Sequence, residues 1–297
     1  MRGGVHRYAA QASLPIDAAT AEKGCFRMET SYLQQIVIDR HLISERNSRM
    51  SLLQQAQTKL TSLCDAARLE RDSTVTVRVL TPDEAIGAKA DPNFVIKKGK
   101  ERVIEACWNE SRGQAFTDRP CDWQGSLDEL LTMDLHQVDR RAVFTAGLNA
   151  VLCGLKQAEG TIHCKDEEPA RCGEEFTRRL HARFGVKRFG MIGLQPAILD
   201  AMVEGFGAVR MRVVDLNEDN INKKICDVMV WDGEKDLEKL IEFCDVGVAT
   251  GSTVVNGSIN DLIEKFQEAG KPLVFFGNTI AGVASLMNLD RICPFAH

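Results

Sequence analysis

The chain has 297 residues, of which 44% are hydrophobic and 27% are charged, and its formal net charge is −5. This length leaves room for two domains with separate hydrophobic cores. The mild negative charge and the low aromatic content of 6% exclude a typical nucleic-acid-binding surface. No apolar run approaches the ~20 residues that a membrane-spanning helix needs. We therefore expect a cytoplasmic protein that binds neither nucleic acid nor membrane.

Residues 1–27 contain no continuous apolar segment, which argues against a signal peptide. We expect that this segment is either a disordered extension or the result of a translation start wrongly assigned upstream of Met28. Ten cysteines without a secretion signal indicate reduced thiols in the cytosol rather than a disulfide framework.

Residues 28–135 are predicted to form a small α+β domain. Apolar residues at helical spacing predict helix over much of residues 31–68, with a break near Asn47. Alternation of β-branched and polar residues predicts strands, and a loop rich in Pro, Cys and Trp follows them at residues 119–125. The predicted strands cover residues 74–80, 93–96, 102–106 and 113–118. Strands that follow one another directly favour an antiparallel sheet.

Residues 136–173 are predicted to be a helix and a linker between two domains. Apolar side chains between residues 141 and 152 recur at helical spacing on one side. The periodicity then stops, and residues 157–171, with the sequence QAEGTIHCKDEEPAR, are polar and contain Gly160 and Pro169. This composition indicates a connecting segment.

Residues 174–297 alternate between helical and strand patterns. Helices are predicted at residues 174–184, 196–206, 237–243, about 256–270 and 283–287. Strands are predicted at residues 188–192, 209–214, 246–249, 273–276 and 292–295, while residues 227–232 fit either a strand or a hairpin arm. The predicted fold class is α/β, with a Rossmann-like doubly wound parallel sheet preceded by the small α+β domain.

Residues 245–277 hold the pattern strand, turn, helix and strand, which predicts a parallel βαβ crossover. Ligands of such sheets bind beyond the carboxyl ends of the strands. The candidate ligand-binding residues at that edge are Thr250, Gly251, Ser252, Thr253, Asn256, Asn278 and Thr279. A phosphate or carboxylate would be held by the flexible backbone and the helix start. Equally, Asn256 or Ser258 would serve only as a helix cap.

A nucleoside cofactor is the less favoured ligand. Gly193 ends one predicted strand and Asp215 the next, near the spacing at which dinucleotide folds place a ribose-binding carboxylate. The turn between them, however, reads GMIGLQP and lacks the GxGxxG fingerprint. Asp215 is therefore either a ribose ligand or a structural cap.

A transition metal is the other candidate ligand. The linker contains an adjacent histidine and cysteine followed by carboxylates, and a further cysteine lies near the end of the chain. Thiolate and imidazole ligands suit zinc, copper, nickel or iron, although no CxxC spacing is present. The predicted metal ligands are His163, Cys164, Glu167, Glu168 and Cys293.

The strings ATGSTVVNGSINDLIE and FFGNTIAG resemble a family of domains of unknown function for which heavy-metal chelation has been suggested. The resemblance is most specific over residues 245–260, looser over residues 188–297, and weak over residues 113–118. It implies an enolase-N-terminal-like domain joined to a Rossmann-like domain, with ligand bound in the cleft between them. That cleft would be faced by residues 250–253 and Asn256. The linker ligands are not implied by the resemblance.

Three functions remain open from the sequence. The favoured one is binding of a heavy-metal ion or a metal-bearing small molecule between the domains. The alternatives are a nucleoside- or S-adenosylmethionine-dependent transferase that acts on a small anionic substrate, and a non-catalytic regulatory protein. The expected partner is a small-molecule or metal ligand, and a homodimer is possible.

Overall fold

The computed structural model describes residues 50–88 and 101–297. The chain divides into two compact units, Met1–Met50 and Ser51–His297, and nearly all of the described residues belong to the second. The predicted extension at residues 1–27, the helical pattern before residue 50 and the predicted strand at residues 93–96 lie outside the described residues. In the part of the chain that is described, no helix has the length and apolar content to cross a membrane.

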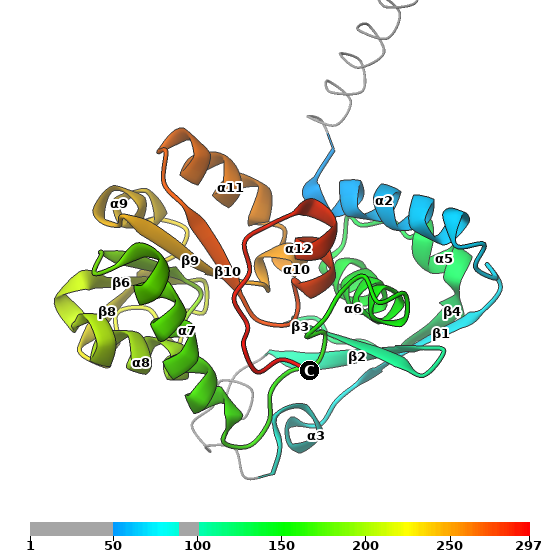
Figure 1. Ribbon diagram of the computed structural model, residues 1–297, viewed down its shortest axis with the longest axis horizontal. Coiled ribbons are helices and arrows are strands. Elements are labelled where there is room, and N and C mark those ends of the chain that lie inside the picture. The colour runs from blue at the N-terminus through cyan, green and yellow to red at the C-terminus, as the bar shows by residue number, and fades with distance from the viewer. Residues whose placement is uncertain (1–49, 89–100) are drawn as a thin grey trace, which may run out of the picture. The chain divides into compact units, whose positions relative to one another are not determined.

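The first half of the unit is built on an antiparallel sheet with the strand order β3-β2-β1-β4 (Figure 1). Its strands are β1 (Thr74–Val79), β2 (Arg102–Trp108), β3 (Ser111–Thr117) and β4 (Trp123–Ser126). Asn109 and Glu110 join β2 to β3, both with positive φ, as a tight hairpin turn requires. Alternate residues of β1, Val75 and Val77, are buried under the helices that cover one face.

In the described part of the chain, four helices accompany this sheet: α2 (Leu52–Ala66), α3 (Pro82–Ile86), α5 (Leu127–Leu131) and α6 (Val138–Gly154). Three of them begin with a capping box, in which a hydroxyl side chain and the side chain three residues later satisfy each other's backbone N–H groups. These caps define the starts of α2, α3 and α5 at Ser51, Thr81 and Ser126.

Helix α6 is the central helix of the unit. It packs on β2 and β3 and also contacts α2, α10 (Thr253–Asn256) and α12 (Ala281–Met287) (Figure 1). Because neighbours surround it, every residue from Ala142 to Leu152 is buried. The sequence predicted an apolar stripe on one side only, since the pattern of one helix does not reveal how many elements cover it.

Gly113 on β3 permits the close approach of α6. A Cβ atom at this position would overlap the backbone nitrogen of Ala150 and the carbonyl oxygen of Ala146. We expect Gly113→Ala to lower the free energy of unfolding by about 3 kcal/mol, because the rigid backbone of α6 would have to move. Urea denaturation followed by circular dichroism measures this loss.

The control for this prediction is Gly270→Ala, which strains a backbone with φ of +62° but finds no atom within 4 Å of the new methyl group. Gly270→Ala should lower the free energy of unfolding by only about 1–2 kcal/mol. Equal losses in the two variants would contradict the packing argument for Gly113.

The second half of the unit contains a sheet with the strand order β10-β9-β5-β6-β8-β7. Its strands are β5 (Phe189–Ile192), β6 (Met211–Asp215), β7 (Lys224–Ile225), β8 (Val228–Asp232), β9 (Val246–Thr250) and β10 (Leu273–Phe276). All neighbours pair in parallel except β7, which pairs antiparallel with β8 at the edge. The chain starts in the middle at β5, runs outward to β8, and returns to β9 on the other side. The α/β fold class is therefore confirmed, and the switch point of the sheet lies between β5 and β9.

Helices cover both faces of this sheet (Figure 1). They are α7 (Glu168–Phe184), α8 (Pro196–Phe206), α9 (Leu237–Phe243), α11 (Ile259–Glu268) and the short α10 and α12, with a 3-10 turn at Ala208–Arg210. Successive strand residues enter different cores: Phe276 packs with residues of α7 and α8, and Phe275 with residues of α9 and α11.

Three local predictions were wrong. Residues 292–295 do not form a strand, since only Arg291 bridges to Phe275 and Pro294 cannot donate a ladder hydrogen bond. The predicted loop at residues 119–125 contains the start of β4, because distant β1 supplies its partner. Helix α7 begins at Glu168, within the predicted linker, because Pro169 is tolerated in a first helical turn.

Residues 227–232 combine both predicted possibilities, since β8 is a strand of the parallel sheet and also the second arm of the β7–β8 hairpin.

The domain boundaries expected from the sequence, at residues 28–135, 136–173 and 174–297, stay a prediction.

Candidate functional site

A cavity of about 1000 Å³ lies at the carboxyl ends of β5, β6, β9 and β10. Elements distant in sequence line it together: the end of β3, the linker before α7, the first turns of α7 and α8, and the segment after α12. Among the predicted site residues, its lining includes Gly193, Asp215, Thr250, Gly251, Ser252, Thr253, Asn256, Asn278, Thr279, His163, Cys164 and Cys293. The volume is at the upper end of the range that small-molecule sites usually have.

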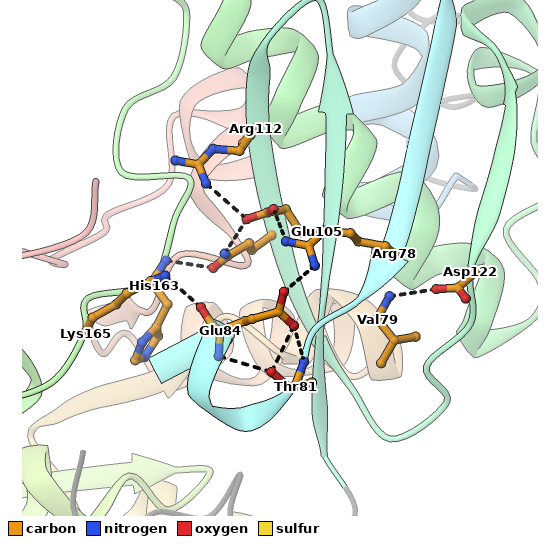
Figure 2. A network of polar contacts seen from close by, with 10 residues as sticks. Arg78, Val79, Thr81, Glu84, Glu105, Arg112, Asp122, His163 and Lys165 are labelled. Atoms are coloured by element: carbon orange, nitrogen blue, oxygen red, sulfur yellow. Dashed lines mark hydrogen bonds and ion pairs between the residues drawn. The ribbon is translucent and has the colours of Figure 1, made fainter. Parts of the chain in front are cut away.

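A polar network holds the linker on the antiparallel sheet beside the cavity (Figure 2). Glu105, only 7% exposed, accepts from Arg78 at 3.2 Å and from the Gln114 side chain at 2.9 Å. The Gln114 side-chain oxygen in turn accepts from the backbone N–H of His163 at 2.9 Å. Lys165 donates to the carbonyl of Glu84 at 2.7 Å. The backbone around His163 is therefore fixed by β2, β3 and α3.

His163 is held as a neutral imidazole with one nitrogen available. Its Nδ1 contacts the carbonyl oxygen of Cys164, so Nδ1 carries the proton and Nε2 keeps its lone pair. Burial lowers the pKa of His163, while the neighbouring Cys293 acts in the opposite direction. The ring lies 5.2 Å from the ring of Phe116, between centroids. A backbone hydrogen bond at Nδ1 is the arrangement by which proteins orient a metal-ligating histidine.

Three thiols meet beside His163. The Cys172 thiol, in the first turns of α7, lies near the thiols of Cys164 and Cys293, and both neighbours act on its pKa. The contact with Cys164 raises the pKa of Cys172 to about 11, an effect that the contact with Cys293 partly offsets. The contact with Cys172, together with burial, raises the pKa of Cys293 well above its usual value. Cys164, Cys172 and Cys293, called the thiol cluster below, are thus held close together, and Cys172 and Cys293 are protonated near neutral pH.

The donors at this wall fit a soft metal ion, although they are not yet arranged around one. Within residues 50–88 and 101–297, no three His, Cys, Asp or Glu side chains are placed so that they could hold a metal ion. Thiolates and a neutral imidazole are nevertheless the ligands that thiophilic ions prefer.

The two predicted carboxylate ligands do not line the cavity. Glu167 is exposed and precedes α7. Glu168 accepts from the backbone N–H of Lys165 at 2.8 Å and contacts the ring of His297 at 2.9 Å. Cys172 lies in the same polar segment but was not among the predicted ligands. The signal for it was its helical spacing from Phe176 and Leu180, the inward face of α7.

The Asp215 carboxylate makes hydrogen bonds with the backbone of the protein. Its Oδ2 accepts from the backbone N–H of Leu194 at 2.7 Å, and its Oδ1 accepts from that of Asn217 at 2.7 Å. The carboxylate therefore caps the turn after β5 and the turn after β6. This arrangement favours the structural interpretation of Asp215 over a ribose ligand.

The turn after β9 is also stabilised internally. The hydroxyl of Thr253 donates to the carbonyl of Thr250 at 2.9 Å, and Asn256 Oδ1 accepts from the backbone N–H and the hydroxyl of Ser258 at 2.9 and 2.8 Å. Helix α10 has only four residues, so its dipole is small. Anion binding at this turn stays a prediction, and these contacts supply no support for it.

Glu101, which the sequence did not suggest, is a half-buried carboxylate in the cavity wall. Burial and the charges of Asp215 and Asp118 raise the pKa of Glu101 to about 7. In the unfolded chain the pKa of a glutamate is about 4.3. Its folded pKa is therefore raised, so the stability that this group contributes is present below about pH 4 and is lost as the pH rises through 7.

We expect Glu101→Gln to remove this loss and to raise the free energy of unfolding near pH 8 by about 1–3 kcal/mol, with a much smaller effect near pH 5. Urea denaturation of both proteins at the two pH values measures the difference. If Glu101→Gln were less stable than the unaltered protein near pH 8, the ionised Glu101 carboxylate would not destabilise the fold, and the prediction would be wrong.

Part of the chain is similar to one known family of domains. Residues 181–286 match the sequence model of DUF364, whose description is "Putative heavy-metal chelation". A DUF364 protein of unknown function from Pyrococcus horikoshii shares 16% identity over 77% of this chain and 79% of that chain, with a TM-score of 0.44. A DUF364 protein of unknown function from Desulfitobacterium hafniense shares 12% identity over 63% of this chain and 72% of that chain, with a TM-score of 0.42. No curated protein matches the chain.

Proposed function

We propose that the cavity binds a thiophilic heavy-metal ion at the thiol cluster, and the match of residues 181–286 to the DUF364 model supports this proposal. The observation that carries this proposal is the meeting of four soft donors from three separate segments at one wall. His163 and Cys164 come from the linker, Cys172 from α7, and Cys293 from the segment after α12. The description of the family supports a metal as the ligand.

The ligands would be the sulfur atoms of the thiol cluster and Nε2 of His163. The three thiols already lie near one another, so metal binding would require loss of thiol protons and rotation of side chains rather than refolding. A bound ion supplies the positive charge that keeps several thiolates stable in a partly buried site. The polar network around Gln114 keeps the linker backbone in place during this change.

The volume of the cavity supports a ligand larger than a bare ion. A space of about 1000 Å³ exceeds what one ion needs and leaves room for a small molecule that carries the metal. In that case the thiol cluster would contact the metal, and the rest of the wall would contact the organic part.

Titration of the anaerobic, reduced protein with Cd²⁺ tests the proposal. We expect one ion per chain to bind with a thiolate-to-metal charge-transfer band in the ultraviolet. The double variant Cys172→Ala, Cys293→Ala should lose both the band and the stoichiometric binding. A band that survives in this variant, or the absence of binding in the unaltered protein, would overturn the proposal.

A further inference from the structure

The register of the antiparallel sheet places two carboxylates opposite each other at the cavity. In the β2–β3 pair, Arg102 lies opposite Thr117, so the preceding Glu101 and the following Asp118 face one another at the strand ends. Both residues line the cavity. Like charges directly opposite on neighbouring strands are destabilising. Asp215, at the carboxyl end of β6 in the other sheet, adds a third carboxylate that acts on Glu101.

The described lining of the cavity as a whole is acidic. Eight of its residues are Asp or Glu: Glu101, Asp118 and Asp215, and five more in α9, α11 and the turns after β6 and β8. Only two are lysines, and each is paired with a carboxylate. Lys235 contacts Asp232 at 2.6 Å, and Lys265 lies 3.4 Å from Glu238. The described wall therefore favours a ligand that carries positive charge.

A second, independent feature indicates hydrogen-bond donors on that ligand. Asn278 lines the cavity and is 1% exposed. Its Nδ2 donates to the carbonyl of Thr161 at 3.2 Å, whereas its Oδ1 has no hydrogen-bond partner among the described residues. A buried acceptor without a partner costs about 1–3 kcal/mol, which a ligand N–H group would recover.

Asn278 is structurally joined to the acidic strand ends. The neighbouring Thr279 accepts, through its hydroxyl, from the backbone N–H of Phe116 at 3.1 Å. Phe116 lies on β3, two residues before Asp118. The unpaired acceptor and the facing carboxylates are thus carried by directly connected parts of the wall.

We propose that this acidic end of the cavity, defined by Glu101, Asp118, Asp215 and Asn278, binds an organic ammonium ion, that is, a small molecule with protonated amine groups. The carboxylates would neutralise its charge, and Asn278 Oδ1 would accept one of its N–H groups. Metal binding at the thiol cluster is a separate matter, because the two sites share no residue.

Isothermal titration calorimetry near pH 8, with the full-length metal-free protein, tests this proposal with three probes of equal chain length. Hexane-1,6-diamine carries charge and N–H donors, hexamethonium carries charge without N–H donors, and adipate carries the opposite charge. We expect saturable binding of the diamine, binding of hexamethonium at least about tenfold weaker, and no binding of adipate, since one lost hydrogen bond to a charged donor corresponds to about tenfold or more.

Two variants at the acidic end and two controls assign the site. Glu101→Gln and Asp118→Asn should each weaken diamine binding at least about tenfold. Glu268→Gln, which removes an exposed carboxylate at the end of α11, and Cys153→Ser, which alters a half-buried thiol on α6 outside the cavity lining, should leave it unchanged. Failure of the diamine to bind, equal binding by all four variants, or binding of adipate would each overturn the proposal. If the protein bound the diamine but not Cd²⁺, the metal proposal would be wrong and the proposal of an ammonium site would still hold.

Discussion

Replacing Cys172 by serine is expected to lower the affinity for Cd²⁺ at least about a hundredfold, more than the loss of a residue that merely orients a ligand. Cys172 lies near both other members of the thiol cluster, so its sulfur atom lies between the linker and the C-terminal segment. Serine has nearly the same shape but supplies a hard, weakly acidic oxygen that a thiophilic ion binds poorly. Competition with a chromophoric chelator under anaerobic conditions measures the change.

Cys153→Ser is the matched control for this experiment, because Cys153 is a half-buried free thiol on α6 that does not line the cavity. Its affinity for Cd²⁺ should equal that of the unaltered protein. If Cys172→Ser also retained the full affinity, the thiol cluster would not be the metal site.

Asn149→Leu is expected to lower the free energy of unfolding by about 3–5 kcal/mol. The Asn149 side chain is fully buried in α6. Its Nδ2 donates to the carbonyls of Gln114 and Thr279, each at 2.9 Å, and its Oδ1 accepts from the backbone N–H of Gly282 at 2.7 Å. Leucine would leave these three backbone groups without a partner inside the core. Urea denaturation measures the loss.

Thr177→Val supplies the contrasting case. Thr177 is 8% exposed, and its hydroxyl has no hydrogen-bond partner among the described residues. Removing a buried hydroxyl that makes no hydrogen bond should be neutral or stabilising. A loss in Asn149→Leu no larger than the change in Thr177→Val would contradict the role given to Asn149.

The same bonds make Asn149 important for the cavity. Through them α6 fixes the turn between β10 and α12, which carries Asn278 and Thr279, to the middle of β3. Asn149 therefore joins the antiparallel sheet to the turn that follows β10 of the parallel sheet, beside the cavity. A polar residue within an apolar helical pattern was the available signal in the sequence, but the pattern alone does not say what it would contact.

The sequence predicted the βαβ crossover of residues 245–277, and β9, α11 and β10 confirm it. Periodicity sufficed there because each element is amphipathic or apolar over its full length. It failed for β4 and for residues 292–295, where pairing with a distant strand, or its absence, decides the structure. Such long-range pairing leaves little trace in the local sequence.

The candidate site was predictable in part for the same reason. The rule that polar residues after parallel strands gather at one edge identified Gly193, Thr250 and Asn278 as neighbours. The meeting of Cys172 with Cys164 and Cys293 depends on the direction in which α7 leaves the linker. The facing of Glu101 and Asp118 depends on strand register, which the sequence does not specify without its turn.

X-ray absorption spectroscopy at the cadmium edge of protein loaded with one equivalent of Cd²⁺ tests the central claim most directly, because it identifies the atoms around the ion. Three sulfur ligands from the thiol cluster and one imidazole nitrogen from His163 are the expected result. A shell made only of oxygen and nitrogen atoms would contradict the account, since it would place the ion away from Cys164, Cys172 and Cys293.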